Sequence, residues 1–163
     1  MKRALLLGLM ILAVTCCSNA FAGHPILNGY AESATEAKEA MKQAQKQLSY
    51  ALAESTKLAR LKDYCKAQTN YIKALQRLNE AMAFVATSKG NTSPEVQAKL
   101  QELEKTINIT AGIDVSRKIV RAEVNRLLSK SSKRTVLYTL VTLSNEAISR
   151  LEECASEYIP LVK

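Results

Sequence analysis

Side chains that could carry out catalysis are few in this chain. The single histidine, His24, lies near the N-terminus, and a nucleophilic triad needs a histidine or an equivalent base beside its nucleophile. Paired carboxylates for catalysis could come from Glu36 with Glu39 or from Glu152 with Glu153, but neighbouring glutamates on helices are usually solvated. No Gly-rich phosphate loop and no Cys-x-x-Cys motif is present. We therefore expect no enzymatic activity, no cofactor and no metal site.

The N-terminal segment has the three parts of a cleavable secretory signal peptide. Lys2 and Arg3 are positively charged, residues 4–14 are apolar, and residues 20–22 form an Ala-x-Ala cleavage site. The apolar run is too short to span a bilayer, which takes about 20 residues. The sequence therefore predicts a signal peptide at residues 1–22 and a secreted or periplasmic protein.

An alternative for this segment is lipidation, with Cys16 or Cys17 acylated after cleavage. Residues 12–15 resemble a bacterial lipobox poorly, because the leucine is one place too far upstream and Thr15 replaces a small residue. We therefore expect cleavage after Ala22 and no lipid anchor.

Removal of the signal peptide leaves two of the four cysteines, Cys65 and Cys154. An even number of cysteines in an exported chain favours a structural disulfide over a metal site. We expect a Cys65–Cys154 bond, which requires the chain to reverse direction near residues 129–132 so that both cysteines reach the same end of the fold.

The spacing of glycine and proline indicates an all-α fold. Neither residue occurs between Tyr30 and Thr87 or between Ile113 and Ile159, and no alternating strand pattern is present. We expect an extended leader at residues 23–32, followed by a single helical domain at residues 33–163. Short connections predict an antiparallel bundle of about five helices, or a stack of helical hairpins.

Helix boundaries and core positions follow from caps and from apolar residues spaced three and four apart. The expected boundaries are a capping box at Ser33 and Glu36, a turn at residues 61–62 before Asp63, an N-cap at Ser93, a break at Gly112, a polar interruption at residues 129–132 and a stop at Pro160. The expected core positions include Leu48, Leu78, Leu103, Ile119, Val124, Leu128, Leu137, Leu140, Leu151 and Tyr158.

Residues 62–75 resemble the second helix of a tetratricopeptide repeat. Tyr64, Ala67, Tyr71 and Ala74 have the small and aromatic residues at the spacing of that family. The match covers about residues 51–79 and no second copy follows, although such arrays usually need at least three repeats. The resemblance implies a helical hairpin whose Tyr64, Ala67, Tyr71 and Ala74 line a groove for a protein partner.

A run of basic residues follows later in the chain, opposed only by Asp114 and Glu123. It comprises Arg117, Lys118, Arg121, Arg126, Lys130, Lys133 and Arg134. Several are four residues apart and so share a helix face. This run is a candidate surface for an anionic membrane or an acidic partner. Nucleic acid is not expected, because no aromatic residues are interleaved with the charges.

Together these patterns predict an exported helical protein that binds another macromolecule without catalysis. Its formal net charge of +8, before loss of Lys2 and Arg3, suits anionic partners of several kinds. The first expectation is a protein partner, with the chain as adaptor, scaffold or inhibitor. The alternative is a peripheral protein of a membrane or envelope surface, docked through the basic run. The oligomeric state stays open.

Overall fold

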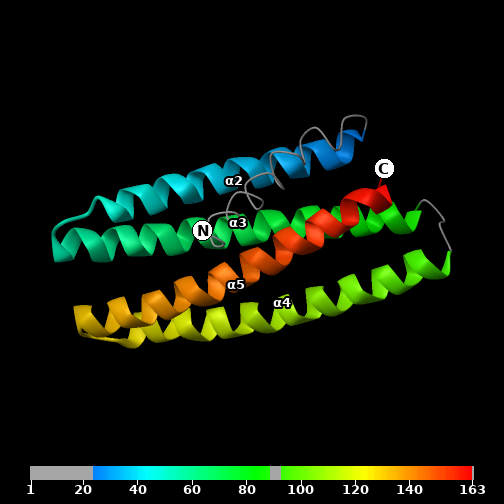
Figure 1. The fold of residues 1–163 in the computed structure, drawn as a ribbon. Coiled ribbons are helices and arrows are strands. Elements are labelled where there is room, and N and C mark those ends of the chain that lie inside the picture. The colour runs from blue at the N-terminus through cyan, green and yellow to red at the C-terminus, as the bar shows by residue number, and fades with distance from the viewer. Residues whose placement is uncertain (1–23, 89–92, 163) are drawn as a thin grey trace, which may run out of the picture.

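A computed structural model describes residues 24–88 and 93–162 of the chain. Within these residues the chain forms four helices: α2 (Pro25–Ser49), α3 (Glu54–Ser88), α4 (Pro94–Arg126) and α5 (Lys130–Val162). Consecutive helices run antiparallel (Figure 1). The all-α class and the antiparallel arrangement are therefore confirmed.

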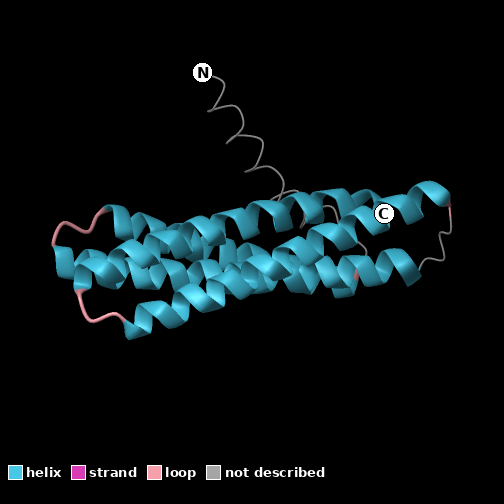
Figure 2. Ribbon diagram, turned by 90° about the horizontal axis from the view of Figure 1, so that it is seen from below, coloured by secondary structure: helices cyan, strands magenta, loops and turns pink. Residues whose placement is uncertain are grey.

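The four helices pack as two hairpins joined through their second members. α2 packs on α3, α4 packs on α5, and α3 packs on α5. α3 and α5 run in the same direction: Cys65 Sγ donates to the Leu137 carbonyl and Asn79 Nδ2 to the Leu151 carbonyl, with a sequence separation of 72 in both cases. Both hairpin turns consequently lie at one end of the molecule (Figures 1 and 2).

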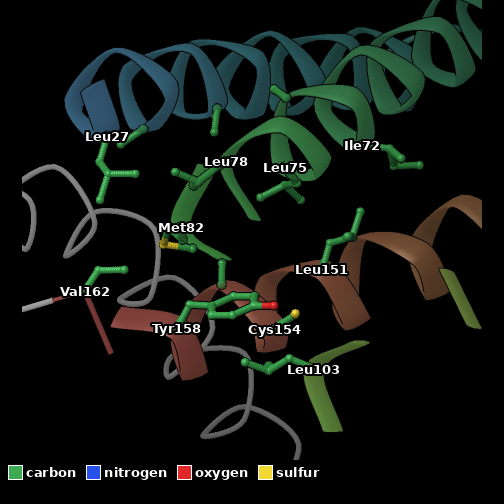
Figure 3. Close-up of a cluster of buried hydrophobic side chains, with 14 of the residues drawn as sticks. Leu27, Ile72, Leu75, Leu78, Met82, Leu103, Leu151, Cys154, Tyr158 and Val162 are labelled. Atoms are coloured by element: carbon green, nitrogen blue, oxygen red, sulfur yellow. The ribbon is translucent and has the colours of Figure 1, made fainter. Parts of the chain in front are cut away.

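The core lies along the contact between α3 and α5 and divides into two clusters of buried side chains. In the larger one, Tyr158, Cys154 and Leu103 gather beneath Met82, while Leu27 joins from α2 (Figure 3). The smaller cluster lies near the turns and contains Leu61, Cys65, Val124, Leu137 and Leu140. The core positions expected on α3 and α5 are buried, including Leu78, Leu137, Leu151 and Tyr158. The expectation was wrong for Ile119 of α4 and for Leu128 in the turn that follows it, which are both exposed.

The expectation of five helices is wrong, because α4 passes through Gly112 without a break. A glycine inside a helix costs about 1 kcal/mol relative to alanine. The buried residues of α4, namely Leu103, Thr110, Arg117 and Val124, recur every seven positions on both sides of that glycine. Their packing continues across Gly112 and keeps the segment helical. Pro160 likewise lies inside the last turn of α5 and does not end it.

The extended leader expected at residues 23–32 is also corrected. α2 begins at Pro25, which occupies a first-turn position where its missing N–H is not needed. Leu27, Ala31 and Ala34 are fully buried, and their packing against the larger cluster accounts for the early start. The cap expected at Ser33 is absent, since that residue lies within α2.

The turn between the first two helices lies at residues 50–53 instead of 61–62. Leu61 is buried in the smaller cluster, and this packing keeps residues 61–62 inside α3. Asp63 forms an ion pair with Arg60 at 3.5 Å rather than capping a helix. Most of the segment that resembles a tetratricopeptide repeat, residues 54–79, therefore lies in the single helix α3.

The expected signal peptide and the alternative acylation at Cys16 or Cys17 fall outside the described residues. For residues 24–88 and 93–162, no helix combines the length and hydropathy that a membrane crossing requires.

The expected disulfide does not form: Cys65 and Cys154 are both buried free thiols. Merging two expected helices into α4 makes α3 and α5 parallel, which sends the two cysteines to opposite ends. At the constant offset between α3 and α5, Cys154 lies level with Met82, about 25 Å along the helix axis from Cys65. A disulfide needs Cα atoms within about 7 Å. The chain does reverse at residues 127–129, close to the expected place.

We expect the protein to lose stability at alkaline pH because burial raises the pKa of Cys65 to about 11 and that of Cys154 to about 12, from 9.0. Burial also raises the pKa of Tyr158 to about 12, from 10.0. Groups with raised folded-state pKa values contribute their full stability below pH 9 and lose it as the pH approaches 12. Urea titrations should therefore show a falling midpoint across this interval.

The matched variant for this experiment is Cys154→Ala, whose stability should fall less steeply over the same pH range. A wild-type midpoint that stays constant to pH 12 would contradict the burial of these groups.

Candidate functional site: a basic cleft

A cleft of about 410 Å³ opens between α3 and α4, and residues of α5 complete its floor. Its floor is apolar, formed by Cys65, Val124, Leu137 and Leu140, which belong to the smaller core cluster. Its walls are polar and carry four cations. The wall residues are Lys62, Lys66, Thr69, Asn70 and Lys73 from α3, and Arg121 and Asn125 from α4. This cleft, hereafter the basic cleft, has the size and mixed lining of ligand sites in proteins.

Helix periodicity explains why α3 presents so much positive charge to the cleft. Lys62, Lys66 and Asn70 are four residues apart and Lys73 follows three later, so they share one face of the helix. The buried residues Tyr64, Leu75 and others occupy the opposite side.

A buried hydrogen-bond network centred on Arg117 holds α4 against α3 beneath the cleft. Arg117 is 2% exposed. Its Nε donates to Ser144 Oγ at 3.0 Å and its Nη2 to Thr69 Oγ1 at 2.9 Å. Its Nη1 forms an ion pair with Asp114 at 2.9 Å. Burial lowers the pKa of the Arg117 guanidinium, and Asp114 opposes that shift. One side chain thus links α3, α4 and α5.

The same network positions Arg121 in the wall of the cleft. The Thr69 hydroxyl donates to the Cys65 carbonyl at 2.9 Å and accepts hydrogen bonds from both Arg117 and Arg121. Arg121 lies one turn beyond Arg117 on α4, where its charge stays exposed. Its orientation is therefore set by a buried hydroxyl, which leaves its remaining N–H groups available.

The electrostatics of the basic cleft favour an anion. None of the lining residues is acidic. Among the ion pairs of the described residues, none involves Lys62, Lys66, Lys73 or Arg121. The Cys65 thiol is protonated at neutral pH, and burial raises its pKa further, from 9.0 to about 11. The cleft therefore offers positive charge and an apolar floor, without an ionised nucleophile.

The basic run expected on one helix face does not form a single surface. Arg117 is inside the protein, and Arg121 faces the basic cleft. Lys118 pairs with Asp114, and Arg126 with Glu123. The remaining three residues, Lys130, Lys133 and Arg134, lie at the start of α5, where Arg134 pairs with Glu54 of α3.

Of the four residues expected to line a groove from the tetratricopeptide resemblance, Tyr64, Tyr71 and Ala74 are buried. The Tyr71 hydroxyl donates to Glu152 Oε1 at 2.6 Å, which joins α3 to α5. Ala67 and Ala74 line a hollow of about 470 Å³ between α2 and α3. The aromatic residues therefore hold the core together instead of presenting a surface to a partner.

Each of the two acidic pairs considered for catalysis has one member in an ion pair with a lysine. Glu152 Oε1 accepts from Lys38 Nζ at 2.8 Å, and Glu39 pairs with Lys42. Over residues 24–88 and 93–162, no three histidine, cysteine or acidic side chains are grouped as a metal site would require.

Sequence reasoning identified Arg121 but missed the three lysines of α3. A usable signal was present, because residues 64–79 contain three basic residues and no acidic one. The interpretation of this segment as a tetratricopeptide-like helix drew attention to its tyrosines and alanines instead.

Comparison of the chain with protein-family models, with curated proteins and with solved structures found no match.

Proposed function

We propose that this chain is an exported, non-catalytic binding protein, and that it holds an acidic segment of a partner protein in the basic cleft. The observation that carries the proposal is the set of four cations around one cleft with no acidic residue in its lining. Unpaired like charges repel one another, and a bound anion offsets this repulsion, so anion binding in the cleft is favourable.

The dimensions of the basic cleft favour an extended acidic segment over one small anion. Lys62 and Lys73 are 11 positions apart on α3, which corresponds to about 16 Å along the helix axis. Carboxylates spaced along an extended peptide can meet cations spread over such a length. The apolar floor adds contact for one or two aliphatic side chains among the acidic residues.

Export is proposed from residues 1–22, with a mature chain that begins at Gly23. A binding role also agrees with the protonated state of the Cys65 thiol, which makes it a poor nucleophile.

We expect a synthetic oligoglutamate peptide to bind the purified protein with an affinity that falls as salt is added. In the double variant Lys66→Gln/Lys73→Gln, affinity should fall about tenfold, or about 1.4 kcal/mol, because two of the four cations lose their charge. Isothermal titration calorimetry at two salt concentrations measures both effects.

The matched control is Lys99→Gln/Lys105→Gln, which removes the same charge from exposed or half-exposed positions of α4 outside the cleft. Its peptide affinity should stay close to the wild-type value. Equal losses in the two double variants would mean that net charge alone attracts the peptide, and the basic cleft would no longer be its site.

A further inference from the structure

The two ends of the helical array carry opposite charge. The end with the hairpin turns, formed by residues 46–63 and 121–134 and hereafter the basic end, holds nine basic and three acidic residues. The opposite end, hereafter the acidic end, comprises residues 24–36, 78–88, 93–104 and 150–162. These described residues hold two basic and nine acidic residues. The helices therefore place a strong separation of charge along the length of the molecule.

Apolar side chains project from the turns at the basic end. Leu128, in the turn between α4 and α5, is 97% exposed, and Leu52, in the turn between α2 and α3, is 89% exposed. Tyr50 is also exposed. An ion pair between Arg134 and Glu54 links the start of α5 to the start of α3 at this end. Both turns lie at the same end of the molecule (Figure 2), so this end carries two leucines whose side chains are almost fully exposed.

The residues around these turns are cationic. Arg126 precedes Leu128, and Lys130 and Lys133 follow it; all three lie at the basic end. Leucine side chains surrounded by lysine and arginine are the combination found where proteins lie in the interface of an anionic bilayer. Entry of apolar side chains into the acyl region lowers the free energy of binding, and so does the attraction of cations to the negative surface potential.

We propose that the basic end docks on an anionic phospholipid bilayer, with Leu52 and Leu128 inserted below the headgroups and Arg126, Lys130 and Lys133 at the headgroup phosphates. The acidic end then points away from the membrane, because the same surface potential repels it. This docking goes beyond the proposed binding of an acidic segment and uses different residues, although the basic cleft lies on the half of the molecule nearer the bilayer.

Charge at the basic end distinguishes Leu52 and Leu128 from other exposed apolar residues. Phe84 is 70% exposed but lies on α3 at the acidic end, where an anionic surface is repelled. Phe84 is therefore a matched control for the leucines: it is large, apolar, exposed and placed at the wrong end.

Tryptophan substitution gives a direct test, because the chain contains no tryptophan. In Leu128→Trp, mixed phosphatidylcholine–phosphatidylglycerol vesicles should shift the emission to shorter wavelength and protect it from an aqueous quencher. In Phe84→Trp the same vesicles should leave the emission unchanged. Equal shifts at the two positions, or no shift at Leu128→Trp, would overturn the proposed orientation.

Vesicle co-sedimentation tests the contribution of the leucines. The mature chain, from Gly23 onward, should bind the mixed vesicles, and pure phosphatidylcholine vesicles at least tenfold more weakly. Leu52→Ser/Leu128→Ser should weaken binding to the mixed vesicles at least tenfold, whereas Phe84→Ser should not change it. Wild-type binding that does not depend on phosphatidylglycerol, or that survives the double serine substitution, would refute the docking.

The two proposals fail separately. Lys66→Gln/Lys73→Gln should bind the mixed vesicles within a few-fold of the wild type while losing oligoglutamate, and Leu52→Ser/Leu128→Ser should show the reverse. Loss of vesicle binding in the cleft variant with retention in the leucine variant would assign lipid binding to the basic cleft and contradict docking through the turns.

Discussion

Replacement of Arg117 by alanine is expected to lower the free energy of unfolding by about 3 kcal/mol. The guanidinium contacts Ser144, Thr69 and Asp114 from a buried position, and its removal takes one charged hydrogen-bond partner from each of them. Removal of one member of a buried ion pair typically costs about 3–5 kcal/mol, and the lower value applies because Asp114 is partly exposed. Urea unfolding followed by circular dichroism gives the measurement.

A neighbouring lysine provides the control for this change. Lys118 forms an ion pair with the same Asp114, but its side chain is 73% exposed. Lys118→Ala should therefore change the free energy of unfolding by no more than about 0.5 kcal/mol. Similar losses for Arg117→Ala and Lys118→Ala would show that α4 does not turn Arg117 inward, and the positioning of Arg121 by Thr69 would then lose its basis.

Replacement of Leu78 by alanine is expected to cost about 2–5 kcal/mol of stability, because the side chain is 1% exposed in the larger core cluster and its loss leaves a cavity. Leu48 was expected to be buried to the same degree, but it is only partly buried beside the smaller cluster. Leu48→Ala should therefore cost less, about 1 kcal/mol.

Leu52→Ala is the third member of this series and should change stability by less than about 0.5 kcal/mol, since its side chain is nearly free of contacts. The predicted order, Leu78 above Leu48 above Leu52, follows burial alone. Equal losses at Leu48 and Leu78 would indicate that α2 lies deeper against α3 than the structure places it.

The basic run illustrates the limit of helical periodicity as a guide to function. Arg117 and Arg121 share a face by spacing, yet one lies in the interior and the other in the cleft. Spacing shows which residues are neighbours on a helix, but whether that face is covered depends on the helix packed against it. Here Thr69 and Ser144 of the neighbouring helices provide the polar partners that make burial of an arginine tolerable.

The basic cleft is a site that spacing along one helix could not predict. Its cations come from residues of α3 and α4 that are distant in sequence, and its floor combines residues of α3, α4 and α5. Each lysine of α3 by itself resembles an ordinary solvated residue. The cleft arises because the main packing of α4 is on α5 and that of α3 is on both α2 and α5, which leaves a space between α3 and α4 above the smaller cluster.

Local patterns in the sequence were sufficient for the helical class, for the core faces of α3 and α5 and for the N-cap at Ser93, whose side chain accepts a hydrogen bond from the Val96 N–H. These features depend on neighbours within a few residues, which is why periodicity and capping rules reach them. The chain reversal at residues 127–129 is also a local feature, and the sequence predicted it within a few residues, at the serine-rich segment 129–132.

Only the tertiary structure decided the number of helices, whether the two cysteines come close enough to bond, and where the charges lie. Gly112 and Pro160 carry local signals for a helix end, but packing of the flanking residues outweighs a cost of about 1 kcal/mol at a glycine. That single continuation made α3 and α5 parallel and separated Cys65 from Cys154. Contacts between helices distant in sequence therefore determined which end of the molecule each residue reached, and with it the location of both proposed binding surfaces.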